Sequence, residues 1–274
     1  MARASEKMKR QLAFDVPVVS VANLHERLGF QHPLDYPAAS LKKELYAWRM
    51  EDDDSPIFRF IYRNFRPHRH LEFGTWEGTG VVYVLEECAA TVWTLNLLHG
   101  ETLADGSWAY SSNVPAAEST KIPWLRRASN WMMRKTVART ATGASLYGYQ
   151  TDSLGFIGRY YLERGLGHRV CQIYSDSREW DTSNYPEGFF DTCLIDGGHQ
   201  EEVVANDTRK ALSLVRRGGL IMWHDFCPVP DVLTRCAAPR GVVGFVKGQW
   251  EKLRSQTNDL FWVEPSHILI GIRS

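Results

Sequence analysis

The hydrophobic positions of this chain fall into short runs that alternate with amphipathic stretches from residue 69 onward. One run of strand length begins at residue 69, and others span residues 91–96, 170–174, 189–195, 220–223, 261–263 and 267–272. Helical spacing follows at 81–88, at 155–162, in the stretch after residue 200 and at 241–256. Strands that alternate with helices form a parallel sheet with helices on both faces. The pattern therefore predicts an α/β fold with a doubly wound, mostly parallel sheet of seven strands that ends in an antiparallel hairpin.

Residues 1–66 precede this pattern and are expected to form an N-terminal helical segment, with helices at 41–50 and 57–64. A run of consecutive acidic residues, 51–54, separates the two helices. Carboxylates that follow one another in sequence do not converge on a cation, so we expect a solvated loop there rather than a metal site. The segment should pack beside the sheet, or supply a dimer contact and part of the substrate entrance.

A glycine-rich turn follows the first strand. Glu72 ends the apolar run, and Gly74, Gly78 and Gly80 come before the helical stretch. Such a turn lets backbone N–H groups and the positive helix end approach a ligand, although it also serves as a plain tight connection. Trp76 stands where a dinucleotide-binding turn needs its second glycine, so NAD is not expected.

Polar side chains also follow two later strands. The run 189–195 is followed by Asp196, a glycine pair and His199, and the run 220–223 is followed by His224 and Asp225. Because ligands bind at the carboxyl ends of parallel strands, we expect these side chains to converge at one edge of the sheet.

Residues 67–274 would form the main domain, interrupted by an insertion at 97–150. From residue 119 to 150 the insertion has six basic side chains and no acidic one, together with tryptophans. Such a long insertion is a candidate cap over an anionic or aromatic small substrate. An exposed amphipathic helix, a dimer arm and a nucleic-acid surface are the alternatives.

The totals exclude several classes of protein. Lys plus Arg equals Asp plus Glu at 32 each, which gives no electrostatic case for nucleic acid or an anionic membrane. The five cysteines include no C-x-x-C pair and are expected as buried thiols. Neither an export signal nor a membrane span is expected, so the sequence predicts a soluble cytoplasmic protein.

The glycine turn resembles the first motif of class I S-adenosylmethionine-dependent methyltransferases, in the branch written E-x-G-x-x-x-G-x-S/T/G. The second cluster resembles O-methyltransferases of sugars and small natural products, in which strand four ends in I-D-G-x-H and strand five in H-D-Y or H-D-F. The resemblance covers about residues 68–271. It implies the Rossmann-like methyltransferase fold and S-adenosylmethionine as the cofactor.

The resemblance assigns cofactor contacts by position, and these are Glu72, Gly74, Thr75, Trp76, Gly78, Gly80, Asn96, Asp176, Ser177 and Asp196. Asn96 takes the place of the acidic residue that holds the ribose hydroxyls in the family. Asp176 or Ser177 would contact the adenine, and an Asx turn that closes the strand is the other interpretation. Asp207, within the helix after His199, is expected to be structural.

In related metal-dependent members, the position of Asp196 and the pair after strand five bind Mg²⁺. The resemblance thus implies a divalent ion held by Asp196, Asp225 and His224, with His199 as the catalytic base beside Asp196. Mg²⁺ prefers oxygen ligands. An imidazole from His224 would favour Mn²⁺ or Fe²⁺ instead, unless His224 only orders the site.

We therefore expect an S-adenosylmethionine-dependent methyltransferase that acts in biosynthesis on a hydroxyl of a small metabolite, such as a natural product, sugar or phenol. A homo-oligomer, such as a homodimer, is expected. The alternatives are N- or C-methylation, other metal-dependent chemistry, an RNA methyltransferase and a non-catalytic binding protein.

Overall fold

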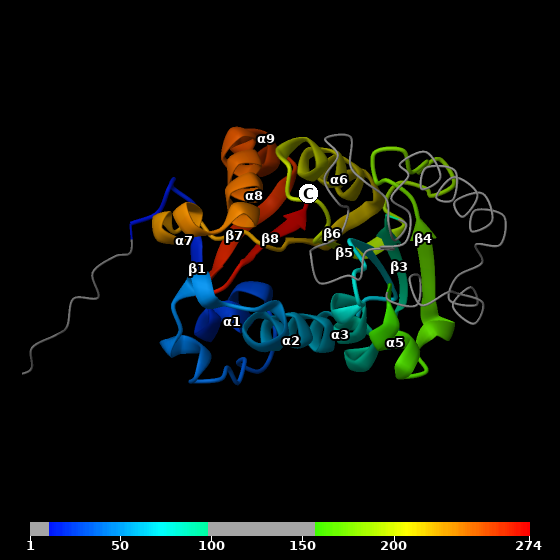
Figure 1. The fold of residues 1–274 in the computed structure, drawn as a ribbon, viewed down its shortest axis with the longest axis horizontal. Coiled ribbons are helices and arrows are strands. Elements are labelled where there is room, and N and C mark those ends of the chain that lie inside the picture. Colours follow the sequence, from blue (N-terminus) through cyan, green and yellow to red (C-terminus); the bar gives the residue numbers. More distant parts are fainter. Residues whose placement is uncertain (1–10, 98–156) are drawn as a thin grey trace, which may run out of the picture.

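The computed structural model describes residues 11–97 and 157–274, and shows a mixed sheet between two layers of helices (Figure 1). In the described ranges the sheet has eight strands in the order β1-β7-β8-β6-β5-β2-β3-β4. Only the β6–β8 and β7–β8 pairs are antiparallel. The strands are β1 (Val18–Ser20), β2 (Arg69–Phe73), β3 (Thr91–Asn96), β4 (Val170–Tyr174), β5 (Phe190–Ile195), β6 (Val215–Trp223), β7 (Thr257–Glu264) and β8 (Ile268–Arg273).

Helices cover both faces of this sheet, as expected of a doubly wound fold (Figure 1). One layer contains α1 (Leu24–Leu28), α2 (Ser55–Phe65), α3 (Thr79–Glu87) and α5 (Arg159–Glu163). The other contains α6 (Glu201–Leu214), α7 (Pro230–Arg235), α8 (Ala237–Gly248) and α9 (Trp250–Ser255). None of the described helices is long and apolar enough to cross a membrane.

The central strand β5 is buried along its whole length, which explains its unbroken apolar run. Cys193 and Ile195 pack in the core under α6 and α8, and Leu194 packs in the opposite core with α2 and α3. Strand β5 is therefore fixed between two cores, and its carboxyl end holds the following residues at a defined place.

The N-terminal segment differs from the prediction. The expected helix at 41–50 is wrong, because the chain forms only 3₁₀ turns at Ser40–Lys42 and Leu45–Ala47 and buries Leu45 and Trp48. The acidic run is not a solvated loop but a π-helical turn, Met50–Asp54, in which Asp53 and Asp54 are buried. The helix expected at 57–64 is confirmed within α2.

The sheet also gains a strand from the N-terminal segment. Strand β1 pairs in parallel with β7, so the predicted count of seven strands is one short. The helix expected at 241–256 is divided into α8 and α9 at Gln249, where the backbone leaves the helical region. The predicted cap at 97–150 lies, from residue 98 onward, outside the described residues.

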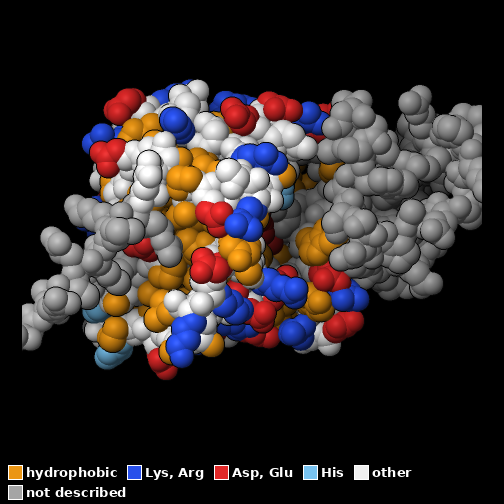
Figure 2. Space-filling view, turned by 60° about the vertical axis from the view of Figure 1, so that its left-hand side comes forward, with side chains coloured by type: hydrophobic (Ala, Val, Ile, Leu, Met, Phe, Trp, Pro, Cys, Tyr) orange, Lys and Arg blue, Asp and Glu red, His pale blue; other side chains and the backbone are white. Residues whose placement is uncertain are grey.

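Hydrophobic side chains lie among Lys, Arg, Asp and Glu side chains on the face shown in Figure 2. Charges of both signs are interspersed there, as the equal totals of 32 suggest.

Candidate functional site

A cavity of about 640 Å³ opens at the carboxyl ends of the parallel strands, between the loops after β2, β3, β4, β5 and β6. Its lining includes nearly all residues predicted from the sequence, namely Glu72, Gly74, Thr75, Trp76, Gly80, Asn96, Asp176, Ser177, Asp196, His199, His224 and Asp225. Gly78 is the predicted residue outside the lining. The cavity also includes Met50, Glu51 and Asp207, which the sequence did not suggest for the site.

The glycine turn holds the backbone close to its neighbours. Gly74 has φ +96°, and a Cβ there would overlap with the backbone oxygen of Asp196. A Cβ at Gly80 would lie 2.8 Å from Oε1 of Glu72. Gly78, with φ +90°, is the N-cap residue directly before α3, and a Cβ there would lie 2.8 Å from the Tyr161 ring. Gly74 and Gly80 thus shape the cavity, whereas Gly78 permits the helix to start against α5.

Asn96 ties this turn to the end of β3. Its side-chain oxygen accepts hydrogen bonds from the backbone N–H groups of Thr75 and Trp76, both at 3.0 Å. Its amide nitrogen donates to the backbone oxygen of Leu97 at 2.8 Å. Asn96 therefore fixes the loop of Thr75 and Trp76 on the cavity wall, and its contact with the ribose stays a prediction.

Two further carboxyl groups occupy the predicted cofactor side. Glu72 is buried, and burial together with the charge of Asp196 raises the pKa of its carboxyl well above the usual range. Asp176 accepts a hydrogen bond from the backbone N–H of Arg178 at 2.9 Å, the pattern of an Asx turn, and pairs with its guanidinium at 2.6 Å. The Asx turn named as an alternative is present, while Asp176 still lines the cavity.

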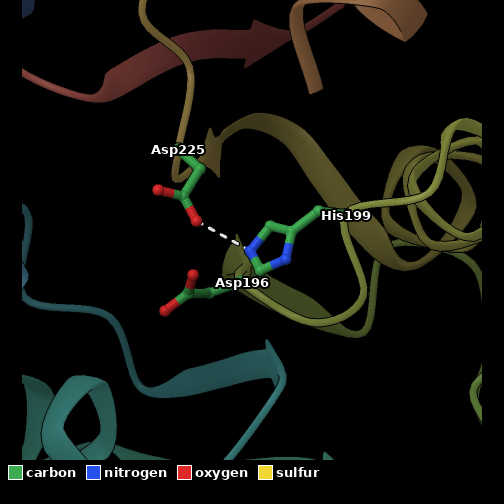
Figure 3. Close-up of side chains that lie close together, drawn as sticks. All are labelled: Asp196, His199 and Asp225. Atoms are coloured by element: carbon green, nitrogen blue, oxygen red, sulfur yellow. Dashed lines mark ion pairs between the residues drawn. The ribbon is translucent and has the colours of Figure 1, made fainter. Parts of the chain in front are cut away.

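Asp196, His199 and Asp225 converge from the loop after β5 and the end of β6 (Figure 3). His199 Nε2 lies 2.7 Å from Asp225 Oδ2, and one possible ligand atom from each of the three residues lies within 4.8 Å of the others. Burial lowers the pKa of the His199 imidazole, but the hydrogen bond to Asp225 and the charges of Asp225 and Asp196 outweigh it and raise that pKa above 6.5.

His224 also lines the cavity and lies next to Asp196 and Asp225. Its Nδ1 is hydrogen-bonded to Asp196 Oδ1 at 2.9 Å, and its Nε2 to Asp54 Oδ2 at 3.1 Å. Despite burial, these two contacts and the charges of Asp196 and Asp225 raise the pKa of the imidazole well above 6.5. Both ring nitrogens therefore face carboxylates, an arrangement in which His224 orders Asp196, and its role as a metal ligand stays a prediction.

Asp54 and His267 complete the surroundings of this site, and neither was expected there. Asp54 Oδ1 accepts a hydrogen bond from the backbone N–H of His267 at 3.2 Å, and His267 Nδ1 lies 3.8 Å from Asp225 Oδ1. Burial raises the pKa of the Asp225 carboxyl, but His224, His199 and His267 hold it well below its usual range. No sequence signal connects Asp54 with His224, because 170 positions separate them.

The profile of a family described as a methyltransferase domain matches residues 71–226. Similar solved structures include the O-methyltransferase TomG of tomaymycin synthesis from Streptomyces achromogenes in complex with S-adenosylmethionine (13% identity, 93% of this chain and 88% of that one, TM-score 0.44). Two others are in complex with S-adenosylhomocysteine. One is an O-methyltransferase from Bacillus cereus (14% identity, 80% of this chain and 80% of that one, TM-score 0.46). The other is the methyltransferase PaMTH1 from Podospora anserina (14% identity, 86% of this chain and 88% of that one, TM-score 0.48). No curated protein sequence matches the chain. Since the family match spans more than half of the chain, this protein belongs to the methyltransferase-domain family and is a class I S-adenosylmethionine-dependent methyltransferase.

Proposed function

We propose that this protein transfers the methyl group of S-adenosylmethionine to a hydroxyl of a small metabolite, with His199 as the general base. The observation that carries the proposal is the His199–Asp225 pair at 2.7 Å beside Asp196, on the wall of the cavity. A histidine held by a carboxylate is suited to remove a proton from a hydroxyl near neutral pH.

The charge of the cavity supports S-adenosylmethionine as the ligand. Six carboxyl groups line it, of which Glu72 has a raised pKa, against one guanidinium, Arg178, and two imidazoles whose pKa values are also raised. Because S-adenosylmethionine carries a positive sulfonium, carboxylates around the sulfur favour the methyl donor over its neutral product. The donor's own carboxylate would lie at the N-terminus of α3, where backbone N–H groups and the helix dipole favour an anion.

The proposed step needs alignment and one proton transfer. The acceptor oxygen attacks the methyl carbon in line with the carbon–sulfur bond, which breaks and leaves its electron pair on sulfur as neutral S-adenosylhomocysteine. His199 takes the hydroxyl proton at Nδ1, while Asp225 accepts a hydrogen bond from Nε2–H and holds the ring. The resulting imidazolium is stabilised by Asp225 and Asp196.

The same carboxylates suit a divalent cation. Asp196 and Asp225 offer the hard oxygen ligands that Mg²⁺ and Mn²⁺ prefer, and His199 is the third donor within reach. We propose that Asp196 and Asp225 hold such an ion. When bound, the ion would lower the pKa of the acceptor hydroxyl. The cytoplasmic location and the homo-oligomeric state stay predictions.

A turnover assay with small hydroxyl-bearing acceptors tests this function. We expect S-adenosylhomocysteine to form together with an O-methylated product. His199→Gln should lower kcat roughly 100- to 10,000-fold without weakening S-adenosylhomocysteine binding. His168→Gln, which changes an exposed histidine outside the cavity, is the control. Methylation of nitrogen or carbon, or unchanged kcat in the His199 variant, would contradict the proposal.

The cation has its own test, which uses chelation and manganese binding. We expect a chelator to reduce turnover, Mg²⁺ or Mn²⁺ to restore it, and Asp196→Asn to weaken manganese binding. His199→Gln should retain manganese binding, because the base is not assigned as a ligand. Full turnover after chelation would exclude the cation and leave His199 as the proposed base.

A further inference from the structure

His267 is a buried histidine beside the site that the proposed methyl transfer does not use. It lies in the turn between β7 and β8, and its side chain is 9% exposed. In the described part of the chain it is not among the residues that line the cavity, and it lies outside residues 71–226, which match the family. A buried ring that does not reach the cavity can act on the reaction only through another residue.

The site residue that His267 contacts is Asp225, the partner of the proposed base. Asp225 Oδ2 lies 2.7 Å from Nε2 of His199, and Figure 3 shows the other carboxylate oxygen pointing away from that ring. Nδ1 of His267 lies 3.8 Å from this second oxygen, Oδ1. The ring of His224 approaches Oδ2 instead, also at 3.8 Å. His267 therefore contacts the oxygen that the base does not use, and can set the direction in which Oδ2 points.

The backbone of His267 holds the same aspartate. Its carbonyl oxygen accepts a hydrogen bond at 3.0 Å from the backbone N–H of Phe226, the residue that follows Asp225. Asp225 has φ +56°, in the left-handed region that residues other than glycine rarely adopt. Such a conformation persists where the surrounding contacts fix it. The turn between β7 and β8 thus supports both the backbone and the side chain of Asp225.

The N-terminal segment fixes the ring of His267 in turn. Nε2 donates a hydrogen bond to the backbone oxygen of Leu45 at 2.9 Å, because a carbonyl oxygen can only accept. The ring of Trp48 stacks on the imidazole, with the centroids 6.5 Å apart and 13° between the planes. A ring with its one hydrogen on Nε2 would turn the lone pair of Nδ1 toward Asp225, so the arrangement favours a hydrogen on Nδ1 as well. His267 therefore presents a donor to Asp225 in a fixed direction.

We propose that His267 is a positioning residue for the base. It holds Oδ1 of Asp225, so that Oδ2 keeps His199 in the orientation that takes the proton of the acceptor hydroxyl. This inference rests on the proposed role of His199. Because Leu45 and Trp48 fix the ring of His267, the N-terminal segment supports the base through this contact.

Two substitutions separate the contact with Asp225 from the contact with Leu45. The amide nitrogen of asparagine lies near the place of Nδ1, so His267→Asn keeps a donor toward Asp225 and loses the bond to Leu45. The amide nitrogen of glutamine lies near the place of Nε2, so His267→Gln keeps the bond to Leu45 and loses the donor toward Asp225. Turnover with S-adenosylmethionine and phenols as acceptors gives kcat and KM, calorimetry gives the affinity for S-adenosylhomocysteine, and urea unfolding gives the stability.

We expect His267→Gln to lower kcat about tenfold, with the KM of the acceptor and the affinity for S-adenosylhomocysteine within about twofold of wild type. His267→Asn should be less stable than His267→Gln, yet keep kcat within about threefold of wild type. A purely structural role predicts the reverse, since the less stable variant would then also be the less active one. His32→Gln, which changes an exposed histidine of the N-terminal segment, should behave as wild type.

The outcomes distinguish this inference from the proposed function. An unchanged kcat in His267→Gln, or a loss in His267→Asn as large as that in His267→Gln, would overturn the inference while methyl transfer by the wild type stands. If His267→Asn does not fold, a double-mutant cycle decides. In the Asp225→Asn background His267→Gln should lower kcat no further, and losses that multiply would overturn the inference. If the wild type forms no product, or His199→Gln keeps its kcat, the proposed function fails and the role of His267 fails with it.

Discussion

At the scale of single residues, burial and charge conflict at Asp207. Burial raises the pKa of its carboxyl from 3.8 to about 6, although the hydrogen bonds from Ser177 and Asn206 act to lower it. The folded protein therefore binds a proton at this residue more readily than the unfolded chain. At neutral pH the ionised carboxyl group therefore lowers the free energy of unfolding. This loss is regained as the pH falls through about 6 toward 3.8, because the carboxyl group is then protonated in the folded protein.

Asp207→Asn should therefore stabilise the protein at neutral pH. A shift of about two pKa units corresponds to roughly 3 kcal/mol, so we expect the free energy of unfolding to rise by up to about that amount at pH 7.5. The gain should shrink toward pH 4.5, where the wild-type carboxyl is protonated in the folded state. Urea unfolding at both pH values measures this. A variant that is less stable than wild type at pH 7.5 would contradict the expectation.

The sequence suggested the residues that directly follow strands, because the carboxyl end of a strand has a known place in a parallel sheet. Asp196, His199 and Asp225 are examples, and the structure brings them together. Asp54 and Asp207 could not be found in this way. Asp54 reaches the site through a turn far away in sequence, and Asp207 faces the cavity from within a helix, where an acidic residue is ordinarily solvent-facing.

At the scale of elements, the π-helical turn Met50–Asp54 connects the N-terminal segment to the site. Asp53 anchors the turn, because its carboxylate accepts hydrogen bonds from Ser40 at 2.6 Å, Lys43 at 2.8 Å and the backbone of Arg49 at 3.0 Å. Asp54 then meets His224, which in turn contacts Asp196. The sequence predicted a solvated loop here because four acidic residues in a row usually remain hydrated.

Asp54→Ala should lower both stability and turnover. It leaves Nε2 of His224 and the backbone N–H of His267 without their carboxylate partner inside the protein. Loss of one member of a buried pair typically costs about 3 to 5 kcal/mol. The kcat should fall because Asp196 loses the support of His224. Asp52→Ala, at an exposed position of the same turn, should change the unfolding free energy by less than about 0.5 kcal/mol.

The glycine turn gives a second prediction at this scale. Gly74→Ala should abolish cofactor binding, because the new Cβ would overlap with the backbone of Asp196 and φ is +96°. Gly248→Ala is the matched control, since a Cβ at the end of α8 meets nothing within 4 Å. We expect that control to bind S-adenosylhomocysteine as the wild type does. Equal binding by both variants would show that the close approach of the turn is unimportant.

At the scale of the whole molecule, the periodic pattern was sufficient to predict a mostly parallel sheet with helices on both faces, whereas the order of the strands comes from the structure. Alternating buried apolar runs and amphipathic helices are typical of folds in which helices pack on a mostly parallel sheet. The N-terminal strand β1 was not predicted, because it has only three residues and forms its hydrogen bonds with the edge of β7. Its sequence alone does not distinguish it from a loop.

The balance of charge over the molecule leads to the last prediction. Acidic and basic residues are equal in number, yet the cavity lining contains more carboxyl groups than cationic ones. The carboxyl groups of the cavity, rather than the net charge of the protein, should therefore attract a cationic ligand. An analogue of S-adenosylmethionine with an amine in place of the sulfonium should bind more tightly than neutral S-adenosylhomocysteine, by about tenfold for an interaction of about 1.4 kcal/mol.

Because the attraction arises from carboxylates inside the cavity rather than from the outer surface, this preference should persist at high salt. Asp196→Asn should reduce it, since Asp196 lines the cavity beside the proposed base, whereas Asp231→Asn, at an exposed position in α7, should not. Calorimetry at low and high ionic strength measures both affinities. If the preference for the amine analogue vanishes at high salt, the attraction comes from surface charges and not from the cavity. Equal affinities for the two compounds at low salt would remove the electrostatic argument for a cationic donor.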